Sequence, residues 1–225
     1  MNFSVKPQPV STRDAVYLTL REQILLCELA PGTAISEKEI SLKFGVSRTP
    51  VRESFVRLAQ EGLLEVYPQR GTFVSLIDPE LVEEARFMRE QLEKAVIRLA
   101  CESFPDDRLA ELDTNLAEQN ACIVQQDYRK MFELDEAFHR TLFEGCRKSN
   151  TWAAMQQINA HLNRSRMLRL AADHHWDHLY LQHLHMAEAI RERDADRAER
   201  LMKEHMSLTI QDQALLKQKF PTYFK

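Results

Sequence analysis

An aspartate and a histidine lie on an otherwise apolar helical stripe. The segment FELDEAFH, residues 132–139, belongs to a run in which apolar residues recur at helical spacing. Residues four apart on a helix share one face, so Asp135 and His139 continue this stripe toward the core. A core-facing acid and imidazole need partners, because an unpaired buried charge costs several kcal/mol.

Two further histidines, His183 and His205, interrupt apolar stripes in the same way. Their helices are expected to meet at a turn near Asp194, and each histidine lies 11 residues from that turn. Folded as an antiparallel pair, the two helices place both imidazoles at one level, about 16 Å from the turn at about 1.5 Å per residue. The two histidines are therefore predicted neighbours.

A divalent metal ion would satisfy one carboxylate and three imidazoles together. Zinc is the first candidate, and nickel, iron and manganese also suit these ligands. The alternatives are that each histidine is a hydrogen-bonded core residue and that the aspartate pairs with an inward arginine. The predicted metal ligands are Asp135, His139, His183 and His205.

Four protein ligands leave one or two positions open on a metal that takes five or six, and an anionic metabolite can fill them. Arg89 lies on an apolar stripe, so its guanidinium can clamp a carboxylate there. The alternative for Arg89 is an ion pair with Glu93 or Asp135. Asn159 and Arg166 also face inward by their spacing and are further candidates for ligand binding.

The first 77 residues have the pattern of three helices followed by a β-hairpin. Ser36 and Glu39 form a capping box and Gly45 provides a stop, which together define a short second helix. The segments LLEVY and GTFVS alternate in polarity and are joined by a short link, as in a hairpin. The expected elements are a flexible arm at residues 1–11, helices at about 11–27, 36–45 and 47–62, and the hairpin at 63–75.

The third of these helices has the features of a DNA reader. Arg48 and Arg52 lie away from its apolar face, and Ser47, Arg48 and Thr49 cluster at its N-terminus, where free amides favour phosphate. Arginine also recognises a guanine edge through two hydrogen bonds. The alternative is an ordinary solvated charged face. A short capped helix, a tight link and a second helix with a basic N-terminal end are typical of a helix-turn-helix.

The stretch SEKEISLKFGVSRTPVRESFVRLAQEGLLEVYPQRGTFV resembles the winged-helix reader of GntR-type bacterial transcription regulators. The helical remainder resembles the FCD effector domain of their FadR-like branch, and the resemblance covers about residues 13–215. It implies a homodimer that binds a palindromic DNA operator and responds to a small metabolite. It maps DNA contacts onto Lys38, Ser47, Arg48, Thr49, Arg52, Arg70 and Gly71. Many FCD domains also carry an Asp-x3-His motif and two later histidines, which match the four predicted metal ligands.

From residue 78 onward nearly every segment is helix-patterned, with breaks expected near Phe104-Pro105, Arg147–Thr151, His174-His175 and Asp194. The fold class is therefore mainly α. The expected domains are a winged helix-turn-helix at 12–77 and an all-helical metal-binding, ligand-binding and dimerisation bundle at 78–225.

Composition sets broader limits. The chain has 225 residues, 44% of them hydrophobic, which is ample for a core. The net charge of −4 does not by itself point to nucleic acid, so only local arrangement can attract phosphates. No apolar run approaches the roughly 20 residues that span a bilayer, and no signal-peptide core is visible. Four cysteines without a CxxC pair indicate reduced packing residues, and we expect a cytoplasmic protein without membrane contact.

These features predict a regulator, in particular a repressor whose operator binding changes when a small organic or sugar acid occupies the metal site. A metal-dependent enzyme is the main alternative. The sequence lacks an HExxH motif and paired Glu-x-x-His motifs, so we expect no enzymatic activity. A second alternative is a regulator in which the metal is purely structural.

Overall fold

The computed structural model describes residues 11–172 and 176–225, and the side chains of all of these except residues 209–212. The chain divides into two compact units, Met1–Leu76 and Ile77–Lys225. Most of the predicted N-terminal arm, apart from Ser11, lies outside the described residues. The expected break at His174-His175 lies outside them as well.

The first unit combines helices with a small antiparallel sheet of strand order β1-β3-β2. The predicted hairpin is present, with Leu64 opposite Val74 and Tyr67 opposite Gly71. Strand β1 was not predicted, because two residues are too short to show an alternating pattern. In order, the elements are α1 (Thr12–Leu25), β1 (Ala34–Ile35), α2 (Glu37–Phe44), α3 (Arg48–Gln60), β2 (Leu64–Tyr67) and β3 (Gly71–Val74).

Local polar signals set the ends of the helices in this unit. The Ser36 hydroxyl accepts the amide of Glu39 at the start of α2, and Gly45 ends that helix with a left-handed φ of 65°. This confirms the predicted stop and the Ser36 half of the capping box, while the Glu39 carboxylate accepts from the Ser36 hydroxyl. Ser47 occupies the N-cap position of α3, but its side chain makes no capping hydrogen bond.

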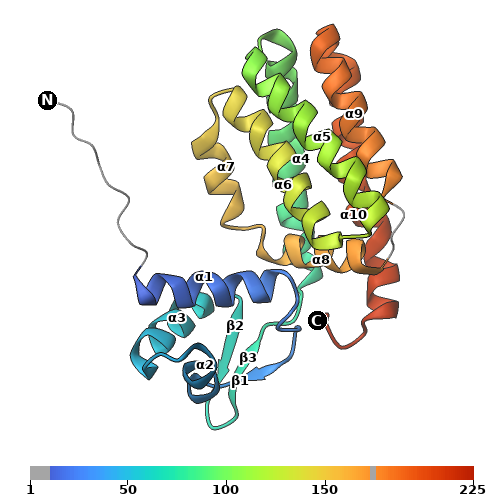
Figure 1. The fold of residues 1–225 in the computed structure, drawn as a ribbon. Coiled ribbons are helices and arrows are strands. Elements are labelled where there is room, and N and C mark those ends of the chain that lie inside the picture. Colours follow the sequence, from blue (N-terminus) through green and yellow to red (C-terminus); the bar gives the residue numbers. More distant parts are fainter. Residues whose placement is uncertain (1–10, 173–175) are drawn as a thin grey trace, which may run out of the picture. The chain divides into compact units, whose positions relative to one another are not determined.

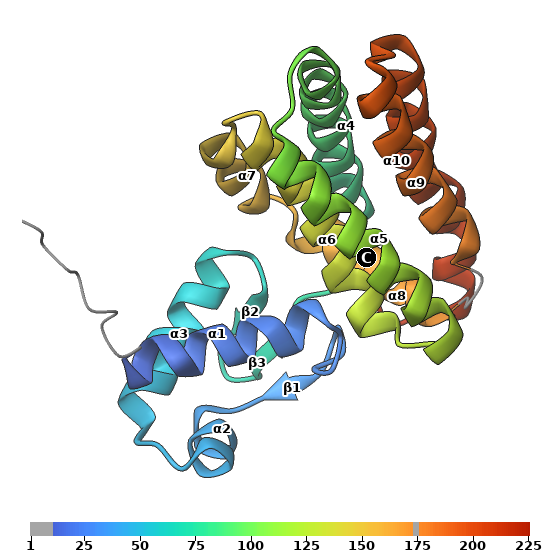
Figure 2. The ribbon, with the colours of Figure 1, turned by 45° about the horizontal axis from the view of Figure 1, so that its top comes forward.

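The second unit is built from helices, which confirms the mainly α fold class. In Figure 1, α4, α5, α6, α9 and α10 run alongside one another, and α8 crosses them near one end. Figure 2 shows α9 and α10 side by side from a second direction. The bounds are α4 (Pro79–Glu102), α5 (Asp106–Gln125), α6 (Tyr128–Gly145), α7 (Ser149–Gln156), α8 (Ala160–Ala172), α9 (Asp177–Glu192) and α10 (Ala195–Lys219).

Two breaks between these helices were not predicted. One follows α5, where Gln126 takes a left-handed φ of 55° and Asp127 then caps α6. The other separates α7 from α8 at residues 157–159. Neither break carries a glycine or proline, so the sequence offers no strong stop signal. The predicted breaks near 104–105, 147–151 and 194 are present, and Asp194 caps α10 by accepting the amide of Arg197.

The start of α4 is held by two distant segments of the same unit. The Ile77 amide donates to the carbonyl of Tyr223 at 2.8 Å, and Ile77 pairs in parallel with Phe224. The Asp78 amide donates to Nδ1 of His161 on α8 at 2.9 Å. This bond gives His161 a structural role at the start of α4.

The four cysteines all lie within the described residues, and none of them forms a disulfide there. Burial raises the pKa of Cys101 and of Cys146 to about 11, so both thiols are protonated and unreactive at neutral pH. Within the described ranges, none of the helices has the length and apolar character that a membrane crossing requires.

Gly145, the last residue of α6, packs against the ring of Phe104. A Cβ atom at position 145 would lie 2.6 Å from Cζ of that ring, well inside van der Waals contact. Gly145→Ala is therefore expected to destabilise the protein by about 1–3 kcal/mol through overpacking, despite the better helix propensity of alanine. Urea unfolding followed by circular dichroism measures the change. In a Phe104→Leu background the same substitution should cost less, and an equal cost in both backgrounds would contradict this explanation.

Candidate metal centre and DNA-reading helix

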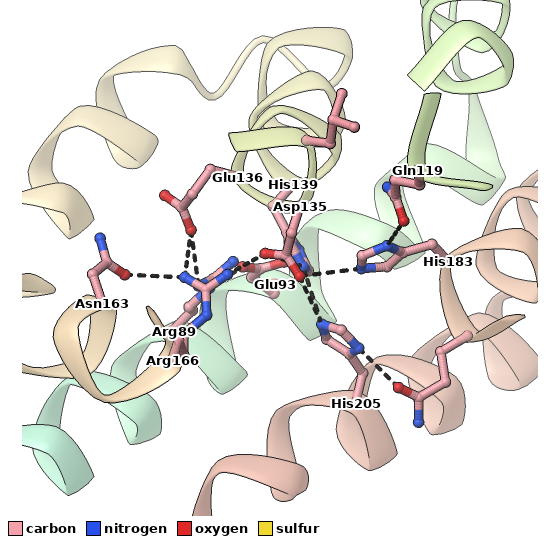
Figure 3. Close-up of polar contacts among 12 residues, drawn as sticks. Arg89, Glu93, Gln119, Asp135, Glu136, His139, Asn163, Arg166, His183 and His205 are labelled. Carbon is pink, nitrogen blue, oxygen red and sulfur yellow. Dashed lines mark hydrogen bonds and ion pairs between the residues drawn. The ribbon is translucent and has the colours of Figure 1, made fainter. Parts of the chain in front are cut away.

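The four predicted metal ligands meet inside the helical unit. Asp135 and His139 come from α6, His183 from α9 and His205 from α10, and all four side chains are buried. One candidate ligand atom from each residue lies within 4.8 Å of the others. Figure 3 shows Asp135, His183 and His205 directed toward one another. The helix spacing and the turn at Asp194 thus place these side chains together, as the sequence indicated.

The shorter separations between these atoms lie in the range of a coordination sphere, and the widest, up to 4.8 Å, needs a small inward shift of the side chains. Nε2 of His139 and Nε2 of His205 are 3.2 Å apart, and Oδ1 of Asp135 lies 3.7 Å from Nε2 of His183. Two ligand atoms that each lie about 2.1 Å from a metal are roughly 3–4 Å apart, depending on the bond angle. A single cation therefore fits among these atoms.

Each imidazole has its other nitrogen engaged by an acceptor oxygen. Nδ1 of His139 contacts Glu93, Nδ1 of His183 lies 2.9 Å from Oε1 of Gln119, and Nδ1 of His205 lies 2.9 Å from Oε1 of Gln182. With the proton on Nδ1, the Nε2 lone pair of each ring faces the centre. Nε2 of His183 is buried and has no hydrogen-bond partner among the described residues. A lone pair left in this position fits a bound cation.

Burial controls the charge of these ligands. It lowers the pKa of His183 to about 3 and holds the pKa of His205 well below its usual value, so both imidazoles are neutral near pH 7. Burial alone would raise the pKa of Asp135, but the charge of Arg166 is the largest opposing effect and the pKa is lowered. Neutral imidazole and ionised carboxylate are the forms that bind a metal.

A buried chain of ion pairs surrounds the cluster. Arg89 bonds Glu93 at 2.6 Å and Glu136 at 3.2 Å, and Arg166 bonds both Glu136 and Asp135 (Figure 3). Arg89 is only 1% exposed, so its guanidinium serves this network. The ion pair with Glu93, one of the two roles weighed for Arg89, is present. Nη2 of Arg89 is buried without a hydrogen-bond partner among the described residues, and the role of Arg89 as a clamp for a ligand stays a prediction.

A cavity of about 60 Å³ adjoins Asp135 and His205. A single water needs roughly 10–15 Å³ on this measure, so the cavity holds a few waters or a small acid. Two arginines, Arg166 and Arg169, contribute positive charge to its wall. Asn159 is fully buried but does not line this cavity, and its amide has no partner among the described residues. The lining residues are Asp135, Ser165, Arg166, Arg169, Leu170, Leu179, His205, Leu208 and Leu216.

Several residues around the cluster were not singled out as site residues in the sequence. Glu93 had a signal, because it lies one turn from Arg89 and on the same helix face. Gln119 and Gln182 had none, since glutamine on a helix is usually a surface residue. Arg169 lies three residues after Arg166, but only the three-dimensional arrangement shows that both reach the same cavity.

The DNA-reading candidates all lie on the exposed surface of the first unit, as their proposed role requires. Arg48 makes no ion pair with another described residue, whereas Arg52 donates through Nε and Nη2 to the Glu37 carboxylate at 3.0–3.2 Å. The two arginines are therefore not equivalent, because Glu37 fixes the orientation of Arg52 and neutralises part of its charge. The exposed candidates are Lys38, Ser47, Arg48, Thr49, Arg52, Arg70 and Gly71.

The first unit is a winged helix-turn-helix, which defines a class of DNA-binding proteins, and it is followed by a helical unit with a buried acid–histidine cluster. Residues 12–74 match the family described as bacterial regulatory proteins, gntR family, and residues 84–208 match the FCD domain. The chain belongs to the GntR family and carries an FCD domain, as the sequence motifs indicated.

Named relatives agree with this assignment. The chain is 36% identical to the HTH-type transcriptional repressor RspR of Escherichia coli K12, over 88% of this chain and 86% of that protein. It is also 36% identical to an HTH-type transcriptional regulator of Streptomyces ambofaciens, over 95% of this chain and 90% of that protein. The solved structure of E. coli McbR/YncC superposes with a TM-score of 0.79 over 94% of this chain and 100% of that chain, at 22% identity, and shows the same fold. This protein is accordingly a DNA-binding transcription regulator and not an enzyme.

Removing the positive charge at the centre of the ion-pair chain tests its contribution to stability. Arg89→Met leaves the buried carboxylates of Glu93 and Glu136 without one of their cations, so we expect a loss of about 3–5 kcal/mol. Urea unfolding of the metal-free protein measures it. Arg98→Met is the matched control, because Arg98 makes exposed ion pairs on the same helix and should change stability far less. Equal losses of unfolding free energy in Arg89→Met and Arg98→Met would show that burial of the ion pairs does not increase their contribution to stability.

Proposed function

We propose that this protein is a homodimeric repressor whose operator binding is modulated by a small organic or sugar acid at a divalent metal site. Residues 12–77 form the DNA-binding domain, and residues 78–225 form the domain for metal, ligand and dimerisation. The observation that carries the proposal is the convergence of four buried ligand atoms within 4.8 Å. As a bacterial DNA-binding regulator, the protein acts in the cytoplasm.

In this proposal the metal is held by Asp135, His139, His183 and His205. Zinc is the first candidate, because neutral imidazoles and one carboxylate suit it, and nickel, iron or manganese are alternatives. A bound divalent ion supplies a Lewis-acidic centre with positions open to an anionic oxygen donor. Arg166 and Arg169, in the wall of the adjoining cavity, are placed to attract the rest of an acid.

Charge balance favours an acidic effector. Among the described residues, the chain of ion pairs joins three carboxylates, on Glu93, Asp135 and Glu136, to two guanidinium groups, on Arg89 and Arg166, and Arg169 adds a positive charge at the nearby cavity wall. With neutral imidazoles the chain of ion pairs carries one excess negative charge, which repels an anion. A divalent cation turns this into one excess positive charge, which a carboxylate then balances. The effector is therefore expected to bind only after the metal.

On the DNA side, the proposal assigns different roles to the two arginines of α3. Arg48 has no ion-pair partner among the described residues and can take a base edge, whereas Arg52 bonds Glu37 and is suited to a phosphate or an outer base contact. Lys38, Ser47, Thr49, Arg70 and Gly71 supply the remaining contacts. The name of RspR, a transcriptional repressor, supports repression as the mode of action.

Loss of either histidine from α9 or α10 is expected to abolish tight metal binding. His183→Ala and His205→Ala each remove one of four ligands, so zinc content after purification should fall well below one ion per chain. Elemental analysis measures it, with circular dichroism to verify folding. His185→Ala is the matched control, because His185 is exposed on the same helix as His183. Full zinc occupancy in both ligand variants would refute the site.

Wild-type protein and the His183→Ala variant can also show whether the metal takes part in sensing an acid or only stabilises the fold. Zinc-loaded wild type bound to operator DNA is titrated with a panel of small organic and sugar acids, and operator affinity is followed by fluorescence anisotropy. We expect at least one acid to change operator affinity in zinc-loaded wild type but not in His183→Ala. If no acid in the panel changes affinity, the metal is structural and the effector part of the proposal fails.

The reading helix is tested on an operator recovered by selection from random duplexes. Arg52→Ala is expected to weaken specific binding on the order of 10- to 100-fold, as for one well-formed arginine contact, while the dimer stays intact. Arg48→Ala should in addition relax sequence preference at one position of each half-site. Footprinting measures operator binding, and sedimentation measures dimerisation. Arg98→Ala in the helical unit serves as the control. Unchanged footprints in both α3 variants would exclude this surface.

A further inference from the structure

The His183 side chain is held by a chain of hydrogen bonds that begins on the helix carrying Asp135. The carbonyl of Leu134 accepts from Nδ2 of Asn115 at 2.9 Å. Oδ1 of Asn115 accepts from Nε2 of Gln119 at 2.6 Å, and Oε1 of Gln119 lies 2.9 Å from Nδ1 of His183. Figure 3 shows Gln119 on the far side of the His183 ring from Asp135. The chain therefore runs from α6 through α5 to α9.

The direction of every bond in this chain is fixed by its first member. A backbone carbonyl can only accept, so Asn115 must present its NH2 group to Leu134 and its oxygen to Gln119. Gln119 must then present its own NH2 group to Asn115 and its oxygen to His183. Reversing either amide would bring two acceptors or two donors together, and at Gln119, whose side chain is fully buried, water cannot replace the lost partners.

The consequence is a single tautomer of His183. Nδ1 faces an oxygen that can only accept, so Nδ1 carries the proton and Nε2 carries the lone pair. Nε2 is the buried atom without a partner among the described residues, and it faces Oδ1 of Asp135 at 3.7 Å. Phe138 stacks on the ring at a centroid distance of 4.3 Å and an interplanar angle of 19°, which fixes the ring plane as well.

From this geometry we infer that Gln119, held in place by Asn115, is a positioning residue of the metal centre, which presets His183 as a ligand through Nε2. The inference rests on the proposed metal site and deepens it. The other two histidines are held differently. Nδ1 of His139 contacts a carboxylate oxygen of Glu93, which Arg89 also binds. No such chain of amides fixes Gln182 among the described residues.

This chain of hydrogen bonds is expected to lower the free-energy cost of metal binding. In a free imidazole the proton exchanges between the two nitrogens, and binding through Nε2 requires the tautomer that keeps Nδ1 protonated. A preset tautomer and a preset ring plane remove this reorganisation from the cost of metal binding. Neither Gln119 nor Asn115 makes a hydrogen bond to a candidate ligand other than His183 among the described residues, so the bond between Gln119 and His183 is their direct link to the centre.

Two substitutions at position 119 test the inference. Gln119→Met removes the acceptor at similar size, whereas Gln119→Glu keeps an oxygen that can accept from Nδ1. In metal-free protein labelled with 15N-histidine, two-bond 15N–1H correlation spectra report the tautomer of each ring. We expect His183 to be the Nδ1-protonated form in wild type and Gln119→Glu, and a mixture of tautomers in Gln119→Met.

Zinc affinity, measured by competition with a chromophoric chelator, provides the second readout. Loss of a supporting partner typically weakens metal binding about 10- to 100-fold, so Gln119→Met should fall in this range and Gln119→Glu should stay near wild type. Asn120→Ala, exposed on the same helix, is the control. If Gln119→Met does not fold, Asn115→Leu makes the same test one bond further away.

The outcomes distinguish this inference from the proposed function. An unchanged His183 tautomer in Gln119→Met, or a changed tautomer with unchanged zinc affinity, overturns the positioning role while the metal site stands. Failure of wild-type protein to bind zinc refutes the metal site itself.

Discussion

The helical unit depends on satisfying one requirement, namely that charges and lone pairs buried in a helical core must be matched. Asp135 and three histidines project into the same small volume, and around them carboxylates and guanidinium groups alternate from α4 to α6 and α8. Removing any member leaves a neighbour without its partner. This mutual dependence holds the long helices in one relative arrangement more specifically than apolar packing alone.

The same requirement applies to the three histidines beside Asp135, whose Nε2 lone pairs need a positively charged partner. The Nδ1–H groups of the three imidazoles donate hydrogen bonds to Glu93, Gln119 and Gln182. The Nε2 lone pairs therefore face the Asp135 carboxylate. Acceptors facing acceptors in a dry core are unfavourable unless a cation lies between them. The proposed metal site is thus the position at which the Nε2 lone pairs and the Asp135 carboxylate need a cation between them.

Helix α8 connects several parts of the helical unit. It carries Arg166, which bonds Asp135, and His161, which accepts the amide of Asp78 at the start of α4. It also contributes Ser165 and Arg169 to the wall of the cavity. One short helix therefore contacts the acid–histidine cluster, the cavity and the first residues that follow the DNA-binding unit in the chain.

The sequence alone determined much of this protein, because the relevant signals are local. Periodicity and caps placed α1, α2, α3 and the hairpin, and the turn at Asp194 allowed His183 and His205 to be paired from their equal distance to it. The DNA-reading motif also lies within one continuous stretch of chain. The strand β1 and the breaks at Gln126 and residues 157–159 escaped prediction, because they lack glycine, proline or a clear pattern.

Only the tertiary structure decided the partners of each polar side chain. Arg89 was equally compatible with a ligand clamp and an ion pair, and the structure shows ion pairs with Glu93 on its own helix and with Glu136 from α6. Gln119 resembles any helical glutamine in the sequence, yet its contact with His183 joins residues 64 positions apart. A hydrogen bond depends on distances of a few tenths of an ångström and on direction, which helical periodicity cannot supply, whereas periodicity suffices to say which residues face the core.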